Sequence, residues 1–308
     1  MWSLSTSKTF KRCQRQWYYK NCLSNARAKD LLRHKAYLLS KLQSISSWRG
    51  NVVDSIISEV IIPSLNSGYI PKLSIVQRKA NELFERQLNF ALRNPLHEPN
   101  FSPTKAGKDF AALHSIEYGK EISDAEIAHA QSEVNQALVN LFENSEIFEK
   151  LLQAEYLIAQ RALVFSHSGE SVRAVPDLIA FYRNEAPLIV DWKVHFFGVY
   201  KAWKQLGIYA LALKRCKPHR DFPNLLKWSE VDYQLWEIQL LTKQIRRYQL
   251  NEMKVLEIEN FMAESIHTMQ LVIGNSKKAD LNSLELLPAS SAEVCQSCNY
   301  QSICWETA

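Results

Sequence analysis

The tract from residue 175 to residue 193 constrains this chain more than any other part of it. It reads Val-Pro-Asp177 and, after a turn, Ile-Val-Asp191-Trp-Lys193. The apolar run before Asp191 is typical of a central strand buried on both faces, where a carboxylate needs a partner. Side chains alternate along a strand, so Lys193 points to the same side as Asp191. We therefore predict that Asp177 and Asp191 lie on neighbouring strands around a divalent cation, with Lys193 beside it.

A metal site with a positive group beside it suits the activation of water against a phosphodiester. Taken alone, the triplet Asp191-x-Lys193 equally fits a surface ion pair, because composition yields roughly one such triplet in a chain of this length. The buried run before Asp191 and the nearby Asp177 favour the catalytic interpretation over the ion pair.

Composition indicates an ordinary globular protein. The 308 residues are 46% hydrophobic and 22% charged, with only 8 glycines and 10 prolines, which argues against a disordered chain. The net charge of +5 is compatible with a polyanionic partner, although many proteins are equally basic. No apolar run is long enough to span a bilayer and no signal peptide is recognisable, so we expect no membrane contact and a cytoplasmic location. Grouped cysteines then indicate metal or cluster ligands rather than disulfides.

Two clusters mix aromatic and basic residues, as surfaces for single-stranded nucleic acid do. Core packing of the aromatic rings explains either cluster equally well. The first comprises Arg12, Arg15, Trp17, Tyr18, Tyr19 and Lys20, and the second comprises Tyr200, Lys201, Trp203 and Lys204.

The order of expected elements predicts an α/β protein with one mixed sheet. Helices are predicted first, at residues 5–45, 52–62, 74–94 and 124–153, with a loop region at 95–120. Strands are predicted at residues 155–165, 172–182, 187–194 and 232–241, and helices at 200–214 and 243–272.

The chain from Glu155 through Asp177 and Asp191-Trp-Lys193 to Gln205-Leu-Gly-Ile-Tyr209 resembles the PD-(D/E)XK nuclease superfamily. Within it, the RecB-type and AddB-type nucleases and the CRISPR adaptation exonucleases are the most alike. They carry an upstream acid, a Gly/Pro-Asp, a hydrophobic run ending in Asp/Glu-x-Lys, and Gln-x-x-x-Tyr. All four occur here in that order, whereas residues 60–150 resemble no family that we can name.

Both ends of the chain extend the resemblance. Many of those enzymes hold an iron–sulfur cluster with one cysteine from an N-terminal segment and three from a C-terminal Cys-x-x-Cys-x(5)-Cys segment. The matching residues here are Cys13, Cys295, Cys298 and Cys304. The resemblance implies a 4Fe-4S cluster, although four thiolates also fit zinc, and unrelated free cysteines remain an alternative. Cys22 and Cys216 are expected to be buried small hydrophobes.

The sequence departs from the family at two positions. Gln14 follows the first cysteine where the family usually has proline. Asp54 stands four residues after Gly50, where the family often has a metal-binding histidine. Aspartate ligates Mg²⁺ or Mn²⁺ well, because hard cations favour oxygen.

The resemblance implies roles for individual residues. Asp177 and Asp191 ligate Mg²⁺ or Mn²⁺, with the Trp192 carbonyl and Asp54 as further ligands. Lys193 orients or deprotonates the attacking water and stabilises the phosphate. Gln205 and Tyr209 share a helix face and either lie by the active site or form a polar stripe on an amphipathic helix. Glu155 is either the upstream acid of the family or a solvated side chain.

The implied fold is a restriction-endonuclease-like core, a mixed sheet flanked by helices, with a helical insertion and iron–sulfur-stapled ends. The expected divisions are residues 1–59, an N-terminal helical segment; 60–153, the insertion; 154–272, the nuclease core; and 273–308, the cysteine segment. We expect a metal-dependent DNA exonuclease acting on ends or single strands, in repair or antiviral defence, with a helicase or integrase as a partner protein. A non-catalytic iron–sulfur DNA-binding subunit and a zinc-stapled interaction protein are the alternatives.

Overall fold

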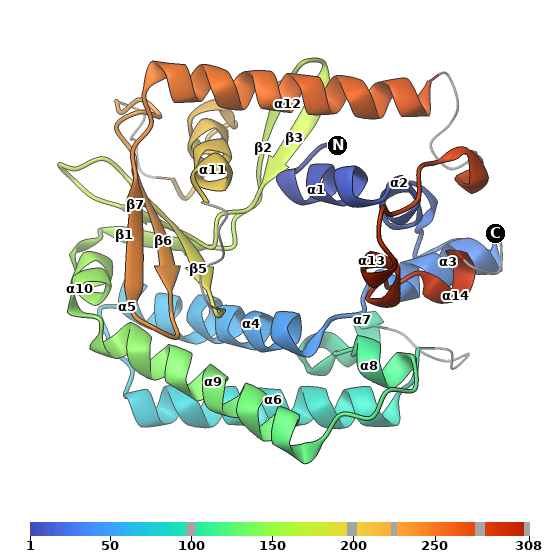
Figure 1. Cartoon of the computed structure of the whole chain (residues 1–308). Helices are drawn as coiled ribbons and strands as arrows, with labels where there is room; N and C mark the ends of the chain where they lie inside the picture. The colour runs from blue at the N-terminus through green and yellow to red at the C-terminus, as the bar shows by residue number, and fades with distance from the viewer. Residues whose placement is uncertain (97–102, 196–201, 223–226, 275–280, 305–308) are drawn as a thin grey trace. The chain divides into compact units, whose positions relative to one another are not determined.

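The computed structural model describes residues 1–96, 103–195, 202–222, 227–274 and 281–304. The chain divides into two compact units, whose helices and strands are labelled in Figure 1. Unit 1 comprises Met1 with residues 46–85 and 123–262, and unit 2 comprises residues 2–45, 86–122 and 263–308. The four consecutive divisions expected from the sequence stay a prediction.

Unit 1 is built on a five-stranded mixed sheet with the strand order β1-β4-β5-β6-β7. Only β5 and β6 run parallel, and the other neighbours are antiparallel. The strands are β1 (Tyr156–Ala159), β4 (Leu178–Phe181), β5 (Leu188–Lys193), β6 (Gln234–Gln239) and β7 (Gln244–Tyr248). Every residue of β5 except Lys193 is buried, as expected of a central strand covered on both faces. The mixed sheet flanked by helices confirms the predicted α/β class, whereas the iron–sulfur-stapled ends stay a prediction.

Two of the predicted strands are each divided in two. Residues 155–165 form β1 and β2 (Leu163–His167), and residues 172–182 lie in β3 (Glu170–Ala174) and β4. The strands β2 and β3 pair as a separate hairpin. The first break falls at Gln160, whose positive φ of 51° turns the chain out of the sheet. The second falls at Pro176, which has no N–H to donate to a ladder.

The predicted helix at residues 243–272 was wrong in its first part. Residues 244–248 form the edge strand β7, and the helix α12 spans Glu252–Ile273. An edge strand faces solvent on one side and takes polar side chains, so the sequence Gln-Ile-Arg-Arg-Tyr gives little strand signal.

The helices of unit 1 include α4 (Ile45–Ile56), which runs into the π-helical η2 (Ile57–Ile61) and then α5 (Ile62–Asn66). The predicted stop at Pro63 was wrong, because Pro63 lies in the first turn of α5, where a missing N–H is tolerated. The others are α6 (Leu73–Arg93), which continues into unit 2 from residue 86, α9 (Asp124–Glu143), α10 (Ser145–Gln153) and α11 (Trp203–Arg215). No described helix is long and apolar enough to cross a membrane.

Helix α11 packs on β5, β6 and the β2–β3 hairpin, and α5 packs on β1 (Figure 1). On its other side α11 approaches α12 closely at Gly207, where an added Cβ would lie 2.3 Å from the Ile258 side chain. This close approach fixes α11 against the sheet, and α11 carries Gln205 and Tyr209.

Unit 2 brings the two ends of the chain together. Its helical elements are short: α1 (Leu4–Arg12), α2 (Gln14–Tyr18), η1 (Tyr19–Leu23), α3 (Leu31–Leu39), α7 (Pro103–Ala106), η3 (Gly107–Asp109), α8 (His114–Glu117), η5 (Ser283–Glu285), α13 (Ala292–Gln296) and α14 (Gln301–Cys304). Aromatic rings form its core. Phe10 meets Trp17 edge-on at 5.1 Å between ring centroids, and Tyr19 stacks on Tyr300 at 5.6 Å.

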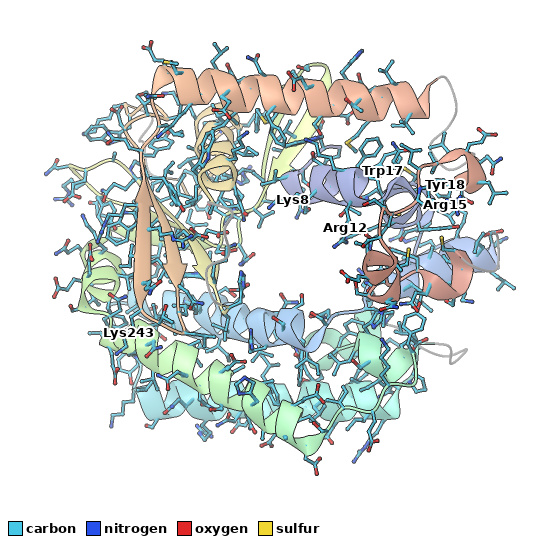
Figure 2. The ribbon with its side chains drawn as sticks, in the orientation of Figure 1. Lys8, Arg12, Arg15, Trp17, Tyr18 and Lys243 are labelled. Carbon is cyan, nitrogen blue, oxygen red and sulfur yellow. The ribbon has the colours of Figure 1, made fainter. Side chains whose placement is uncertain are left out.

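For the aromatic members of the cluster at residues 12–20, the structure agrees with the core-packing alternative rather than with a stacking surface. Trp17, Tyr18 and Tyr19 are at most 5% exposed, so their rings serve the core, whereas Arg12 is exposed (Figure 2). In the second cluster, residues 200 and 201 lie outside the described residues. Lys204 there lies over the Trp203 ring and pairs with Glu257 at 2.9 Å.

Candidate active site and cysteine pocket

Asp191 lies near the end of β5 and is only 1% exposed. Its Oδ2 atom lies 2.5 Å from the ammonium of Lys193. Its Oδ1 atom accepts a hydrogen bond from Gln205 Nε2 at 2.7 Å. A buried carboxylate needs such partners, and here a neighbour on the same strand and a residue of α11 supply them.

Asp177 immediately precedes β4 and reaches across to β5. Its Oδ2 atom accepts a hydrogen bond from the backbone N–H of Trp192 at 2.8 Å, and its Oδ1 atom accepts one from Gln160 Nε2 at 3.2 Å. Trp192 lies beyond the last residue of β5 that pairs with β4, so the carboxylate of Asp177 continues the contact between the two strands. The structure therefore brings Asp177 and Asp191 together.

Asp54 of α4 is the third carboxylate of this group. Burial, and then the negative charge of Asp191, raise the pKa of Asp54 to about 7, although Lys193 opposes the shift. Burial, followed by the charges of Asp191 and Asp54, raises the pKa of Asp177 well above its ordinary value. Each carboxylate disfavours the charged form of its neighbours, so Asp54 belongs to one electrostatic group with Asp177 and Asp191.

Lys193 is the positive group among these acids. Burial alone would lower its pKa, but the charges of the surrounding carboxylates, Asp191 foremost, raise the pKa of Lys193 above its ordinary value. The side chain is therefore an ammonium that offers charge and hydrogen bonds.

Gln205 and Tyr209 share one face of α11, one turn apart. Gln205 Nε2 donates to Asp191 and lies 2.8 Å from the hydroxyl of Tyr209. Burial and the nearby carboxylates, Asp191 first, raise the pKa of Tyr209 strongly, so its hydroxyl stays protonated. The pair thus contacts the carboxylate group and is more than a solvated polar stripe.

The structure does not bring Glu155 to the other site residues. Glu155 precedes β1 and donates its N–H to Phe181, at the opposite end of β4 from Asp177. Four residues of strand separate these ends, roughly 13 Å at about 3.3 Å per residue. Its exposed carboxylate pairs with Arg183 at 2.8 Å, in agreement with the solvated alternative.

Two further side chains near the site escaped the sequence analysis. Arg49 of α4 is 8% exposed, forms an ion pair with Glu133 of α9, and donates to Ser46 Oγ at 3.2 Å. It also donates to the carbonyl of Val194, directly after Lys193, at 2.5 Å. Arg49 therefore fixes the backbone where β5 ends. Nothing in the local sequence pattern distinguishes it from a surface arginine.

Glu237 of β6 is the second, and it is the register partner of Asp191 on the neighbouring parallel strand. It is 4% exposed, accepts a hydrogen bond from the Tyr248 hydroxyl at 2.8 Å, and lies 3.8 Å from Arg246. The signal was present in the sequence, since Glu237 is an acid within an apolar run, as Asp191 is.

The donor chemistry of this carboxylate group fits a hard divalent cation. If all three aspartates are ionised, the single ammonium of Lys193 leaves two negative charges, the charge that one Mg²⁺ or Mn²⁺ ion would balance. Among the described residues, however, no three or more His, Cys, Asp or Glu side chains are already arranged as a metal-binding group. The carboxylate oxygens of Asp177 and Asp191 instead accept hydrogen bonds from protein groups. A bound cation would have to displace or reorient some of these donors.

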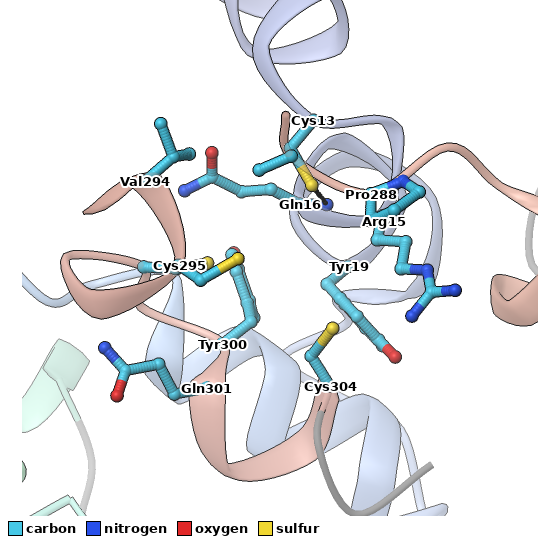
Figure 3. A pocket seen from close by; sticks show the side chains of 12 residues that line it. Cys13, Arg15, Gln16, Tyr19, Pro288, Val294, Cys295, Tyr300, Gln301 and Cys304 are labelled. Carbon is cyan, nitrogen blue, oxygen red and sulfur yellow. Dashed lines mark hydrogen bonds between the residues drawn. The ribbon is translucent and has the colours of Figure 1, made fainter. Parts of the chain in front are cut away.

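The four cysteines of the sequence motif line one pocket of unit 2 (Figure 3). Cys13 lies between α1 and α2, Cys295 belongs to α13, and Cys304 ends α14. The other lining residues are Arg15, Gln16, Tyr19, Pro288, Ala289, Val294, Cys298, Tyr300 and Gln301. The chain therefore gathers sulfur atoms from residues almost 300 positions apart in its sequence.

Burial raises the pKa of the Cys298 thiol to about 11, and the other three cysteines add to the rise. Burial also raises the pKa of Cys304, against the opposing charge of Arg15. Four sulfur donors facing a shared pocket fit a soft metal or an iron–sulfur cluster, which would displace the thiol protons on binding. Cys22 and Cys216 are 8% and 6% exposed, which confirms their predicted burial.

Residues 1–305 match the sequence pattern of the PD-(D/E)XK nuclease superfamily. The chain belongs to this superfamily. Membership implies nuclease activity, and PD-(D/E)XK nucleases typically use Mg²⁺ or Mn²⁺. The five-stranded mixed sheet of this PD-(D/E)XK protein agrees with the restriction-endonuclease-like fold.

Two solved structures are similar to this PD-(D/E)XK protein over much of the chain. The protein SSO0001 is 15% identical, and the likeness covers 73% of this chain and 95% of that one, with a TM-score of 0.31. The protein VC1899 from Vibrio cholerae is 9% identical, with 79% and 63% covered and a TM-score of 0.25. No curated protein matches the chain.

Proposed function

We propose that this protein is a metal-dependent DNA exonuclease that acts on DNA ends or single strands. It hydrolyses a phosphodiester: water forms a bond to phosphorus, the bond to the leaving sugar oxygen breaks, and that oxygen takes up a proton. The observation that carries the proposal is the group formed by Asp54, Asp177, Asp191 and Lys193 in unit 1. Three carboxylates and one ammonium are close enough to shift one another's pKa values.

In this proposal Asp54, Asp177 and Asp191 hold Mg²⁺ or Mn²⁺, with the Trp192 carbonyl as a further ligand. The bound ion would lower the pKa of a water molecule and neutralise charge on the phosphate. The carboxylates repel one another while they lack a cation, and this repulsion favours binding of a divalent ion over a monovalent one.

Lys193 has the charge and the reach to orient the attacking water and to stabilise the negative charge that develops on the phosphate. The raised pKa of Lys193 supports this role over that of a general base. Gln205 holds the Asp191 carboxylate in one orientation, and Tyr209 holds Gln205 in turn. Glu155 has no part in the proposed chemistry, because it lies at the far end of β4.

The cysteine pocket supports the second part of the proposal. We infer that Cys13, Cys295, Cys298 and Cys304 hold a 4Fe-4S cluster, as in the RecB-type, AddB-type and CRISPR adaptation nucleases that the sequence resembles. Zinc is the competing occupant, because four thiolates also suit it. The same resemblance supports a role in DNA repair or antiviral defence beside a helicase or integrase.

One experiment tests the nuclease proposal directly. Linear and circular single-stranded DNA, each uniformly labelled, are incubated with the full-length protein and Mg²⁺ or Mn²⁺, and linear duplexes are tested in parallel. We expect degradation of the linear single strand and resistance of the circle, because an exonuclease needs an end. Asp191→Asn and Lys193→Ala are expected to abolish degradation.

The matched control is Lys243→Ala, which removes an exposed lysine paired with Glu143 at 2.5 Å outside the carboxylate group. This variant should degrade DNA like the parent protein. Cleavage of the circle would replace the exonuclease with an endonuclease. Full activity of Asp191→Asn would remove the catalytic assignment, and DNA binding without any cleavage would favour a non-catalytic subunit.

A further inference from the structure

The charge of this protein is distributed very unevenly along the chain. Residues 1–41 contain ten lysines and arginines and a single acidic residue, Asp30. The whole chain contains 37 basic and 32 acidic residues, so the rest of it holds more acidic than basic side chains. The net positive charge therefore comes entirely from the first 41 residues, which, apart from Met1, belong to unit 2.

The cations of this segment face outward while its aromatic rings face inward. Lys8 and Arg12 are exposed, stand one turn apart on α1, and project from the same side of that helix (Figure 2). The opposite side of α1 packs into unit 2, where Ser7 Oγ lies 2.7 Å from Ser265 Oγ and Phe10 packs on Trp17. The helix is thus amphipathic, with a cationic outer face on a rigid inner one.

Three of the four arginines of the segment donate to neutral acceptors. Arg12 donates to the side-chain oxygen of Gln16 at 2.6 Å, Arg15 to the Leu286 carbonyl at 3.2 Å, and Arg33 to the Leu23 carbonyl at 3.2 Å. These bonds fix the guanidinium groups in place without cancelling their charge. Planar guanidinium groups held in this way are well suited to phosphate oxygens.

Lys20 adds a second line of evidence. Burial and then the positive charges of Arg12 and Lys41 lower the pKa of Lys20. Arg12 of α1, Lys20 of η1 and Lys41, two residues after the end of α3, therefore lie close enough to repel one another. Repulsion of this kind destabilises a fold until an anion is bound among the charges.

We propose that the exposed cations of residues 8–41 in unit 2 form a binding surface for the phosphate backbone of single-stranded DNA. This inference rests on the proposed function, because a nuclease substrate is the polyanion that the chain must hold. Binding is electrostatic and independent of sequence, since Trp17, Tyr18 and Tyr19, which could otherwise stack on bases, are buried in the core.

The test measures binding of a fluorescent single-stranded oligonucleotide by anisotropy, in EDTA so that no cleavage occurs. The test variant is Lys8→Gln/Arg12→Gln/Lys20→Gln. Each phosphate contact with single-stranded DNA contributes about 0.7 to the slope of log affinity against log salt. We therefore expect the slope to become shallower by about 2, and the affinity at low salt to fall by at least about tenfold.

The matched control is Lys72→Gln/Lys79→Gln/Lys217→Gln, which removes the same charge from exposed positions of unit 1. It should bind within about twofold of the parent protein. Equal losses in the two variants would reduce the effect to net charge and overturn the proposal. Thermal unfolding of both variants checks the fold, and Lys8→Arg/Lys20→Arg, which keeps the charges, should bind like the parent protein.

A second assay distinguishes failure of the DNA-binding surface from failure of the proposed nuclease activity. Hydrolysis of bis(p-nitrophenyl) phosphate with Mn²⁺ probes the carboxylate group without a long polyanion, and the test variant should leave it unchanged. A parent protein that binds DNA but hydrolyses nothing would refute the nuclease and leave the surface standing. A parent protein that binds polyglutamate and not DNA through these cations would refute the surface and identify an acidic protein as its partner.

Discussion

The carboxylate group of unit 1 and the cysteine pocket of unit 2 are assembled in opposite ways. Most residues of the first lie between Asp177 and Tyr209, on adjoining strands and one helix, and only Asp54 comes from far away. The second joins Cys13 to three cysteines near residue 300. The acids are held by hydrogen bonds from Trp192, Gln205 and Gln160, whereas the pocket offers the thiols mainly apolar and aromatic neighbours.

This difference indicates what each site needs from a metal. The carboxylate group keeps its geometry through the protein alone, so a metal there supplies chemistry. In the cysteine pocket individual thiols have protein partners, such as the Gln16 N–H that donates to Cys13 Sγ, but a bound cluster would join all four sulfur atoms and so supply structure. Removing metal from the two sites should therefore have different consequences.

Removal of divalent metal should give the largest effect on activity. We expect EDTA to abolish DNA cleavage completely while the unfolding temperature stays nearly constant, and Mg²⁺ or Mn²⁺ to restore cleavage. The reason is that hydrogen bonds hold the acids in place without the ion. The measurement pairs a cleavage assay with thermal unfolding on the same samples. Loss of folded structure in EDTA would show that the carboxylate group also depends on metal for its stability.

Loss of the cluster should give the largest effect on stability. Cys298→Ala is expected to lose the brown colour of an iron–sulfur protein and about 5 kcal/mol of unfolding free energy, because a link from Cys13 to Cys295 closes nearly the whole chain. Anaerobic purification followed by urea unfolding measures both. Cys216→Ala, a buried cysteine outside the pocket, should keep the colour and lose much less. A colourless parent protein that contains zinc would contradict the iron assignment.

The contrast also explains how far the sequence alone could lead. Asp177, Asp191 and Lys193 were predictable because their positions on short strands follow from alternation and from an apolar run. The hydrogen bond from Gln160 to Asp177 was not predictable, since it depends on the positive φ with which Gln160 turns the chain out of the sheet after β1. Arg49 was not, because its partners Glu133 and Val194 are 84 and 145 residues away. The strand β7 was missed because its polar residues suit a sheet edge.

Arg49 tests whether the end of β5 needs support from outside the sheet. Arg49→Met leaves Glu133 partly buried without its cation, and we expect a loss of about 3 kcal/mol of unfolding free energy. Arg49→Met/Glu133→Gln removes both charges and should recover part of that loss. If support of the Val194 carbonyl matters for Lys193, both variants should have a lower kcat than the parent at an unchanged KM. Equal kcat in all three proteins would limit Arg49 to stability.

Gln205 tests the hydrogen bond that orients Asp191. Gln205→Leu removes the donor at similar volume, and we expect kcat to fall about tenfold, equivalent to about 1.4 kcal/mol. Gln205→Glu should be worse, because it places a negative charge against Asp191. Steady-state cleavage at saturating Mg²⁺ measures both variants. A Gln205→Glu variant as active as the parent would show that Gln205 and Asp191 separate when the substrate binds.

Substitution of Glu155 should have the smallest effect on cleavage. It tests whether the upstream acid of the family pattern takes part in catalysis in this chain, where it lies away from the other acids. The pattern places an acid at the start of the core, but here the exposed Glu155 pairs with Arg183, and Gln160 occupies the place beside Asp177. We expect Glu155→Gln to change cleavage by less than about twofold and stability by less than about 1 kcal/mol, as for other exposed ion pairs. Gln160→Ala is its counterpart at the other end of β1 and should slow cleavage more. A tenfold loss of cleavage in Glu155→Gln alone would contradict the placement of Glu155 outside the active site.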